Sequence, residues 1–251
     1  MNFPVKTALV SAALVALCAC SSNTKTSQNV SSETPNSAPS TTPSGQAAAA
    51  NKQALVRFVQ AVPGKMDLWF GDEKVFSNVA YKDVTQYTEL PAERHDFKLA
   101  PAGTNQPTAP ASNSEGLSGG RHYTIVAQRK NGKLDINVVN DDLTAPQAGK
   151  AKVRVINAAT GLGSIDVYDP AGKVVTGISA DSASSYESVA PAQGTLEIRR
   201  ADKHTDVARV PNFTVEADKL YTIVIAGGAG HRYEAIPVTD QLTPAAPPTG
   251  D

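Results

Sequence analysis

The feature that most constrains the fold is an internal repeat, because the central part of the chain occurs twice with a period of about 98 residues. The opening block Val56–Ala61 returns as Val153–Ala158, and Tyr123–Val126 returns as Tyr221–Val224. Further matching blocks keep the same register: Met66–Trp69 with Ile165–Tyr168, Tyr87 with Tyr186, Phe97–Leu99 with Leu196–Ile198, and Asp141–Thr144 with Asp240–Thr243. This period is much longer than that of solenoid repeats, so it indicates a tandem duplication of a whole domain.

Within each copy, apolar and polar residues alternate with a period of two, which is typical of strands with one buried face. Val56 and Phe58 flank Arg57, for example, and turn residues such as Pro63-Gly64 separate the runs. No stretch shows helical periodicity beyond one turn. We therefore predict an all-β fold of two tandem immunoglobulin-like β-sandwich domains, built from antiparallel sheets with one face in water.

Two local signals place particular strands. Asn131-Gly132 lies between two strand-like runs, and both residues tolerate a positive φ, so a tight hairpin is predicted there. Pro237 lies in the last strand of the second copy and cannot donate to a ladder, which places that strand at a sheet edge.

Composition predicts the remaining segments of the chain. We assign the two β-sandwich repeats to residues 53–145 and 150–243. Residues 20–52 are rich in Ser, Thr, Ala and Pro and carry too little apolar surface to offset the entropy of ordering, so a disordered tether is predicted. Residues 244–251 form a similar tail. Because few anchoring residues join the two copies, we expect each copy to fold independently.

Residues 1–19 have the pattern of a bacterial lipoprotein signal peptide. Lys6 precedes an apolar run from about Ala8 to Leu17, which is too short to span a bilayer. Cys20 follows the small residue Ala19, with Leu17 three positions before it, as a Cys that becomes diacylated requires. An ordinary secretory signal cut near Ala19 is the alternative. We expect palmitate-type lipid chains on Cys20 to anchor the protein to a membrane.

The same segment predicts a place in the cell envelope. Ser21 follows the lipid-bearing Cys20 where an Asp would resemble an inner-membrane retention signal, so the outer membrane, facing the periplasm, is favoured in a Gram-negative cell. Cleavage before Cys20 removes Cys18 and leaves no second thiol for a disulfide. The formal net charge is −1 and no basic stripe is present, so we expect no nucleic-acid partner.

The repeated blocks resemble the bacterial family called domain of unknown function 4397. The resemblance rests on the opening Val153–Ala158, the short strand Asp166–Tyr168, the turn Leu90–Ala92 and the strand Tyr221–Val224. The family's frequent His-x-Ser-Pro segment after the first strand is not matched. The resemblance extends to both copies, and it implies an exported cell-envelope module without bringing a known activity.

Motifs for catalysis are missing from the sequence. None of the four histidines lies in a recognisable motif, and no Gly-x-Ser-x-Gly elbow is present. We therefore predict a membrane-anchored, non-catalytic envelope lipoprotein without a cofactor, whose two modules bind or space a protein, a glycan or a wall component. The alternative is an enzyme or enzyme subunit of the envelope whose site is assembled from scattered residues.

Four residues form the candidate binding surface. Trp69 and Asp67 share the strand face opposite the aliphatic core, and Tyr168 and Asp166 repeat this arrangement in the second copy. An aromatic ring beside a carboxylate can stack on a sugar or anchor a protein partner. In the alternative interpretation, neighbouring side chains or a loop cover the rings, because large aromatic side chains are usually well buried.

The candidates for a metal site are Asp141 and Asp142. Extracellular sandwiches can bind Ca²⁺ between domains, and these two carboxylates precede the linker between the copies. Asp is also an ordinary turn former at such a place, and we otherwise expect no metal.

Replacement of Cys20 by Ala tests the lipid anchor. Because the thiol is the acceptor for the lipid, the Cys20→Ala protein should lose palmitate labelling and leave the membrane fraction. The Cys18→Ala protein is the matched control and should label normally. Unchanged labelling of the Cys20→Ala protein would contradict the predicted anchor.

Overall fold

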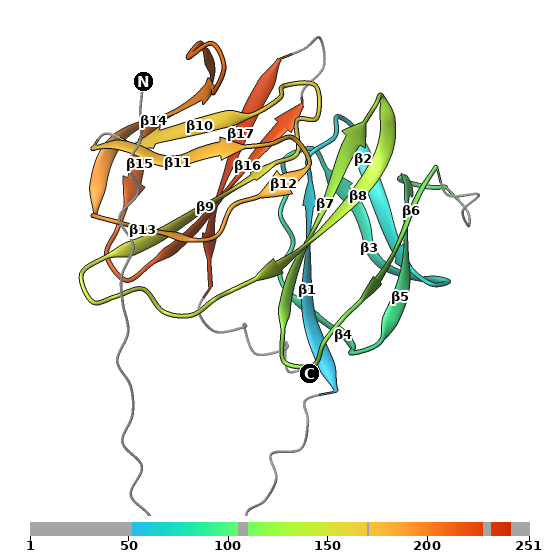
Figure 1. Cartoon of the computed structure of the whole chain (residues 1–251). Coiled ribbons are helices and arrows are strands. Elements are labelled where there is room, and N and C mark those ends of the chain that lie inside the picture. Colours follow the sequence, from blue (N-terminus) through green and yellow to red (C-terminus); the bar gives the residue numbers. More distant parts are fainter. Residues whose placement is uncertain (1–51, 105–109, 170, 228–231, 242–251) are drawn as a thin grey trace, which may run out of the picture. The chain divides into compact units, whose positions relative to one another are not determined.

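The structure is a computed structural model, and it describes residues 52–104, 110–169, 171–227 and 232–241. The predicted signal peptide, the lipidation site Cys20, almost all of the predicted tether and the tail lie outside these residues. Every regular element in the described part is a strand, which confirms the all-β prediction (Figure 1). Among the same residues, no helix has the length and apolar character needed to cross a bilayer.

The first repeat is a sandwich of two four-stranded sheets. One sheet has the order β4-β1-β7-β8, and the other has the order β3-β2-β5-β6. Buried side chains from all eight strands, Phe58, Leu68, Phe97 and Ile125 among them, form the core between the two sheets. The strands are β1 (Gln53–Gln60), β2 (Lys65–Phe70), β3 (Glu73–Ala80), β4 (Thr88–Pro91), β5 (Arg94–Pro101), β6 (Ala111–Gly116), β7 (His122–Lys130) and β8 (Lys133–Asp141).

The second repeat has the same strand order, which agrees with a tandem duplication. Its sheets have the orders β12-β9-β16-β17, with β13 also paired to β9, and β11-β10-β14-β15. A separate apolar core lies between these sheets. The strands are β9 (Ala151–Asn157), β10 (Ile165–Asp169), β11 (Gly172–Ile178), β12 (Ser182–Ala183), β13 (Glu187–Val189), β14 (Ala192–Arg200), β15 (Asp206–Val215), β16 (Leu220–Gly227) and β17 (Tyr233–Asp240).

Both local strand predictions are confirmed. β7 and β8 form an antiparallel hairpin around Asn131 and Gly132, whose φ values are 52° and 77°. Two consecutive residues with positive φ match the right-handed twist of the flanking strands. Pro237 lies in β17, which pairs only with β16 and so forms the edge of its sheet.

The prediction of purely antiparallel sheets was wrong for the central strands. β1 pairs with β7 in parallel, from Leu55 opposite His122 to Gln60 opposite Ala127, and β9 pairs with β16 in the same way. Alternation of apolar and polar residues reports which face of a strand is buried, but it carries no information about the direction of the neighbouring strand.

The prediction of a solvated sheet face was also wrong for the sheets that contain β1 and β9. Their second faces are buried in a third apolar cluster, to which both repeats contribute. Its fully buried members include Val59 and Val126 from the first repeat and Ile156 and Val224 from the second. The face that sequence alternation assigns to water is therefore the contact between the two repeats.

Two buried arginines cross this contact. Arg57 Nη2 in β1 lies 2.6 Å from Asp240 Oδ1 of the second repeat, and Arg154 in β9 pairs with Asp141 of the first repeat. Arg57 and Arg154 occupy equivalent positions in the two repeats, as do Asp141 and Asp240. All four side chains are at least 96% buried, and each arginine has its shortest ion pair with an aspartate of the other repeat, although Arg57 Nε also lies 3.9 Å from Asp141 of its own repeat.

Hydroxyl groups complete this network. In each repeat, the aspartate accepts hydrogen bonds from a threonine and a tyrosine of the same repeat, and the threonine hydroxyl accepts one from the arginine. Thr124 and Tyr87 donate to Asp141 at 2.7 and 2.6 Å, and Thr222 and Tyr186 donate to Asp240 at 2.6 and 2.8 Å. Burial raises the pKa of both tyrosines well above the ordinary value, so these hydroxyls remain donors through the neutral range.

The shared core and the crossed ion pairs contradict independent folding of the two copies. A separated repeat would expose the apolar face around Val59 or Ile156 and leave a buried arginine without its aspartate. The described residues accordingly fall into one compact unit. We therefore expect both repeats to unfold in a single cooperative transition.

Replacement of Arg57 by Leu tests this coupling. Removal of one member of a buried ion pair typically costs about 3–5 kcal/mol, which for a chain of this size lowers the melting temperature by roughly 6–20 °C. The Arg57→Leu/Asp240→Leu double variant should lose less than the sum of the single variants, because neither charge is then left unpaired. Lys98→Ala, which breaks an exposed ion pair with Asp72, is the control and should cost about 1 kcal/mol or less. Two separate melting transitions in calorimetry would contradict the coupling.

Candidate functional site

The structure buries Trp69 and Asp67 rather than displaying them. Both residues lie in β2 on the face that points away from the core, as predicted, but they are only 3% and 2% exposed. The ammonium group of Lys74, on neighbouring β3, lies 4.8 Å from the centre of the Trp69 ring and donates to Asp67 at 2.7 Å. The prediction of an exposed stacking surface here was therefore wrong, and the covered alternative describes Trp69.

Asp67 has a structural role in this position. Its carboxylate accepts hydrogen bonds from the backbone N–H groups of Asn78, at 2.6 Å, and Gly103, at 3.2 Å. Asn78 has a φ of 55°, and the pairing of β2 with β3 shifts register close by. Burial alone raises the pKa of Asp67, but the hydrogen bonds from Lys74 and the two backbone groups hold that pKa below its usual value. Asp67 thus stabilises a bulge in β3.

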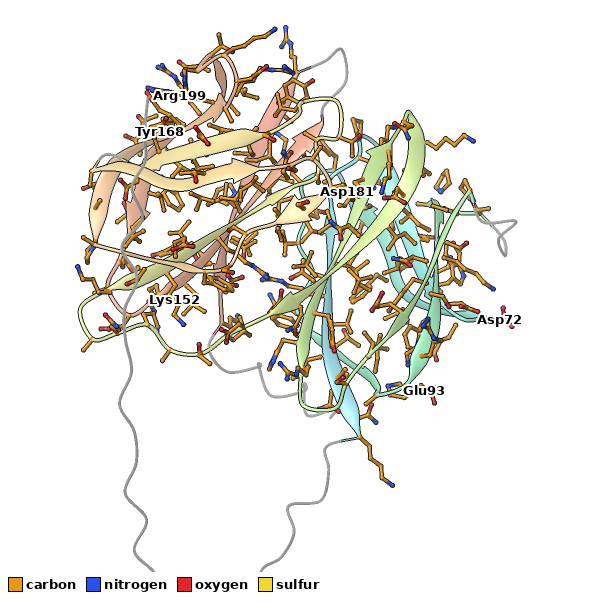
Figure 2. The ribbon with its side chains drawn as sticks, in the orientation of Figure 1. Asp72, Glu93, Lys152, Tyr168, Asp181 and Arg199 are labelled. Atoms are coloured by element: carbon orange, nitrogen blue, oxygen red, sulfur yellow. The ribbon has the colours of Figure 1, made fainter. Side chains whose placement is uncertain are left out.

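The second repeat keeps the bulge but leaves its aromatic ring more accessible. Asp166 is 3% exposed and accepts a hydrogen bond from the backbone of Gly177, whose φ is 65°. Tyr168 is half-buried, and the Arg199 guanidinium lies 4.5 Å from its ring centre (Figure 2). Arg199 also pairs with Asp206 at 3.2 Å. The ring therefore lies beneath a network of surface ion pairs.

The carboxylates of both candidate metal ligands already interact with other groups of the protein. Asp141 accepts hydrogen bonds from Thr124 and Tyr87 and pairs with Arg154, so its oxygens already have partners. Asp142 accepts a hydrogen bond from the backbone N–H of Thr144 at 3.2 Å, and this bond lowers the pKa of its carboxyl. Within the described residues, no group of three or more His, Cys, Asp or Glu side chains could hold a metal ion. Asp142 is thus a turn former, as the alternative interpretation proposed.

The first repeat carries a groove that no pattern in the sequence indicates. It lies between β3 and β4, which are the edge strands of the two sheets, and it has a volume of about 600 Å³. Its apolar lining includes Phe70, Val75 and Leu90. These residues are far apart in the sequence, and only the packing of one sheet on the other brings them together.

His95 supports one wall of this groove. Its ring packs against that of Phe70, with the ring centres 3.5 Å apart and the planes tilted by 33°, and its Nε2 atom lies 2.8 Å from the carbonyl oxygen of Pro91 at the end of β4. The side chain is 7% exposed. These contacts join β2, β4 and β5 at one wall of the groove.

The rim of the groove is acidic. Glu73, Glu89 and Glu93 are exposed along it, and Figure 2 labels Glu93 on the turn between β4 and β5. Two cations also line the groove, but both have other partners. Lys74 pairs with Asp67, and Arg94 donates to the backbone carbonyl of Ser114 at 3.2 Å.

The second repeat has a smaller groove at the equivalent place. It lies between β11 and β13, has a volume of about 240 Å³ and includes Asp169 and Glu187 in its lining. Where the first repeat has Phe70 and His95, the second has Asp169 and Gly194. The aromatic wall is therefore specific to the first repeat.

Comparison with known proteins gives a family match for part of the chain. Residues 54–168 match the model of a family described as a domain of unknown function (DUF4397). The match is one stretch that covers the first repeat and ends in β10, so the predicted family resemblance is confirmed there, but two tandem copies are not detected. No curated protein matches the chain.

A likeness to one solved structure is weak. The crystal structure of CBMbc, a family CBM26 module of Eubacterium rectale Amy13K in complex with maltoheptaose, aligns with 79% of this chain and 100% of that chain. The sequence identity is 9% and the TM-score is 0.22. A TM-score this low does not establish a common fold.

Truncation of the two matching aromatic residues tests their different environments. Trp69→Ala should cost about 3–5 kcal/mol, because it leaves a cavity beneath Lys74. Tyr168→Ala should cost less, roughly 1 kcal/mol, since the ring is only half-buried and packs against the partly exposed Arg199 side chain. Chemical denaturation of both variants measures the difference. Equal losses would show that the two rings are buried alike.

Proposed function

We propose that this chain is a lipid-anchored, non-catalytic protein of the cell envelope that binds a partner in the groove of its first repeat. The anchor is Cys20, and Ser21 favours the outer membrane in a Gram-negative cell. The partner is a protein, glycan or wall component. In this proposal the second repeat is mainly a support, coupled to the first through the crossed Arg–Asp pairs.

The proposal follows from how the chain would display the groove. A flexible chain with the length predicted for the tether, residues 20–52, would span about 30 Å root-mean-square, which would be enough to carry the repeats away from lipid headgroups. The buried contact between the repeats makes the displayed body stiff. A stiff body on a flexible tether can search a volume near the membrane without first ordering its own binding surface.

The observation that carries the proposal is the difference between the two grooves. The fold places a groove between edge strands in both repeats, but only the first repeat lines it with an aromatic–histidine wall and reaches about 600 Å³. Concave sites of several hundred Å³ with a few fixed polar groups are typical of binding sites. The first groove is therefore the proposed site, and the second groove provides an internal control.

Photo-crosslinking in intact cells tests this assignment. A photoreactive phenylalanine analogue at Glu89, on the rim of the first groove, should form a discrete adduct. The same analogue at Ser188, the equivalent position of the second repeat, should form none. Phe70→Asp, which introduces the residue found in the second repeat, should abolish the adduct, and a melting curve checks that the variant stays folded after losing the ring contacts with His95 and Phe97. Equal crosslinking from Glu89 and Ser188, or none from Glu89, would contradict the proposed site.

A further inference from the structure

The geometry points to a particular class of partner: we infer that the groove between β3 and β4 binds an extended, positively charged peptide segment, which joins an edge as an added strand. This inference rests on the proposed function and specifies the partner of the same site. Three independent properties of the groove carry it, namely its open strand edges, its apolar lining and its unneutralised carboxylates.

Both walls of the groove are strand edges. β3 ends the order β3-β2-β5-β6, and β4 ends the order β4-β1-β7-β8, so each strand pairs on one side only. An edge strand presents backbone N–H and C=O groups at the spacing of a partner strand. An extended peptide can use these groups, as in the known modes of recognition by strand addition.

The lining supplies contacts for alternate side chains of such a peptide. Phe70, Val75 and Leu90 form the apolar part of the groove, whereas Glu89 is exposed on the same strand as Leu90. Because successive side chains of a strand point to opposite sides, a bound strand would place every second side chain against the apolar lining and the others near the rim. The matching peptide therefore alternates apolar and polar residues.

The acidic rim determines which charge the polar residues of the bound peptide should carry. Among the described residues, the side chains of Glu73 and Glu89 form no hydrogen bond or ion pair, and the Glu93 carboxylate lies 3.9 Å from the His95 ring, which carries charge only when it is protonated. Lys74 and Arg94, the two basic residues of the lining, are engaged with Asp67 and the Ser114 carbonyl. Three carboxylates thus face the groove without close compensation. Lys or Arg side chains on the bound strand would supply the missing positive charge.

The same carboxylates disfavour other occupants of the edge. Charged side chains along an edge strand oppose its pairing with apolar strands, including strands of a second copy of this chain, which would bring like charges together. A basic strand reverses the sign of this interaction. The rim therefore acts both as protection against aggregation and as the determinant of selectivity.

Peptide binding to the purified protein, residues 20–251, tests the inference. The probe is a fluorescein-labelled peptide of about nine residues that alternates Val and Lys, compared with a Val/Glu peptide of equal length. In fluorescence anisotropy, the Val/Lys peptide should bind at least about tenfold more tightly than the Val/Glu peptide, and should weaken between about 50 mM and about 300 mM salt. Equal affinity for the two peptides would overturn the inference.

Matched variants assign the interaction to the groove. Glu89→Lys should weaken binding of the Val/Lys peptide at least about tenfold, whereas Glu187→Lys, in the groove of the second repeat, should leave it unchanged. N-methylation of alternate amides in the peptide should abolish binding, because a methylated nitrogen cannot donate to the strand edge. Insensitivity to Glu89→Lys, or binding of the N-methylated peptide, would also overturn the inference.

The outcomes separate this inference from the proposed function. If Glu89 crosslinks in cells but no peptide binds, the groove is a binding site for another class of partner, and only the inference fails. If neither peptide binding nor crosslinking occurs at Glu89, both fail.

Discussion

The rest of the structure depends on the crossed pairs Arg57–Asp240 and Arg154–Asp141. Removing two arginines and two aspartates from water is unfavourable unless every donor and acceptor is satisfied. Here the attraction between the charges is supplemented by threonine and tyrosine hydroxyls, which complete the coordination of both carboxylates. Because each arginine finds its counter-charge in the other repeat, the network specifies how the two sheets pack, and the apolar contacts around it follow.

Much of the fold could be predicted from sequence because the signals are local. Periodicity identified the strands, Asn131-Gly132 identified a hairpin, and Pro237 identified an edge strand. The contact between the repeats could not be predicted in this way. Arg57 alternates with Val56 and Phe58 as a solvent-facing residue would, and its partner Asp240 is 183 residues away. Because of this long-range pairing, the polar side of the β1 pattern faces the other repeat and not solvent.

The candidate site shows the same division between local and long-range information. Sequence correctly placed Asp67 and Trp69 on the strand face opposite the core, but their exposure depends on Lys74 and on the backbone near Gly103. The groove was not predicted at all, because it forms where Phe70 and Leu90, on strands of different sheets, approach each other. The spacing of residues within one sequence segment cannot predict this contact between strands of different sheets.

The covalent connection between the repeats has a consequence for how the protein can change. Two separate identical subunits related by a two-fold axis would carry every substitution twice, once on each side. With both copies in one chain, the positions of Phe70 and His95 in the first repeat are occupied by Asp169 and Gly194 in the second. The arginine, threonine, tyrosine and aspartate of the contact between the repeats are the same in both copies. Because the two copies share one chain, the groove residues of the two repeats can differ while the residues of the contact between the repeats are kept.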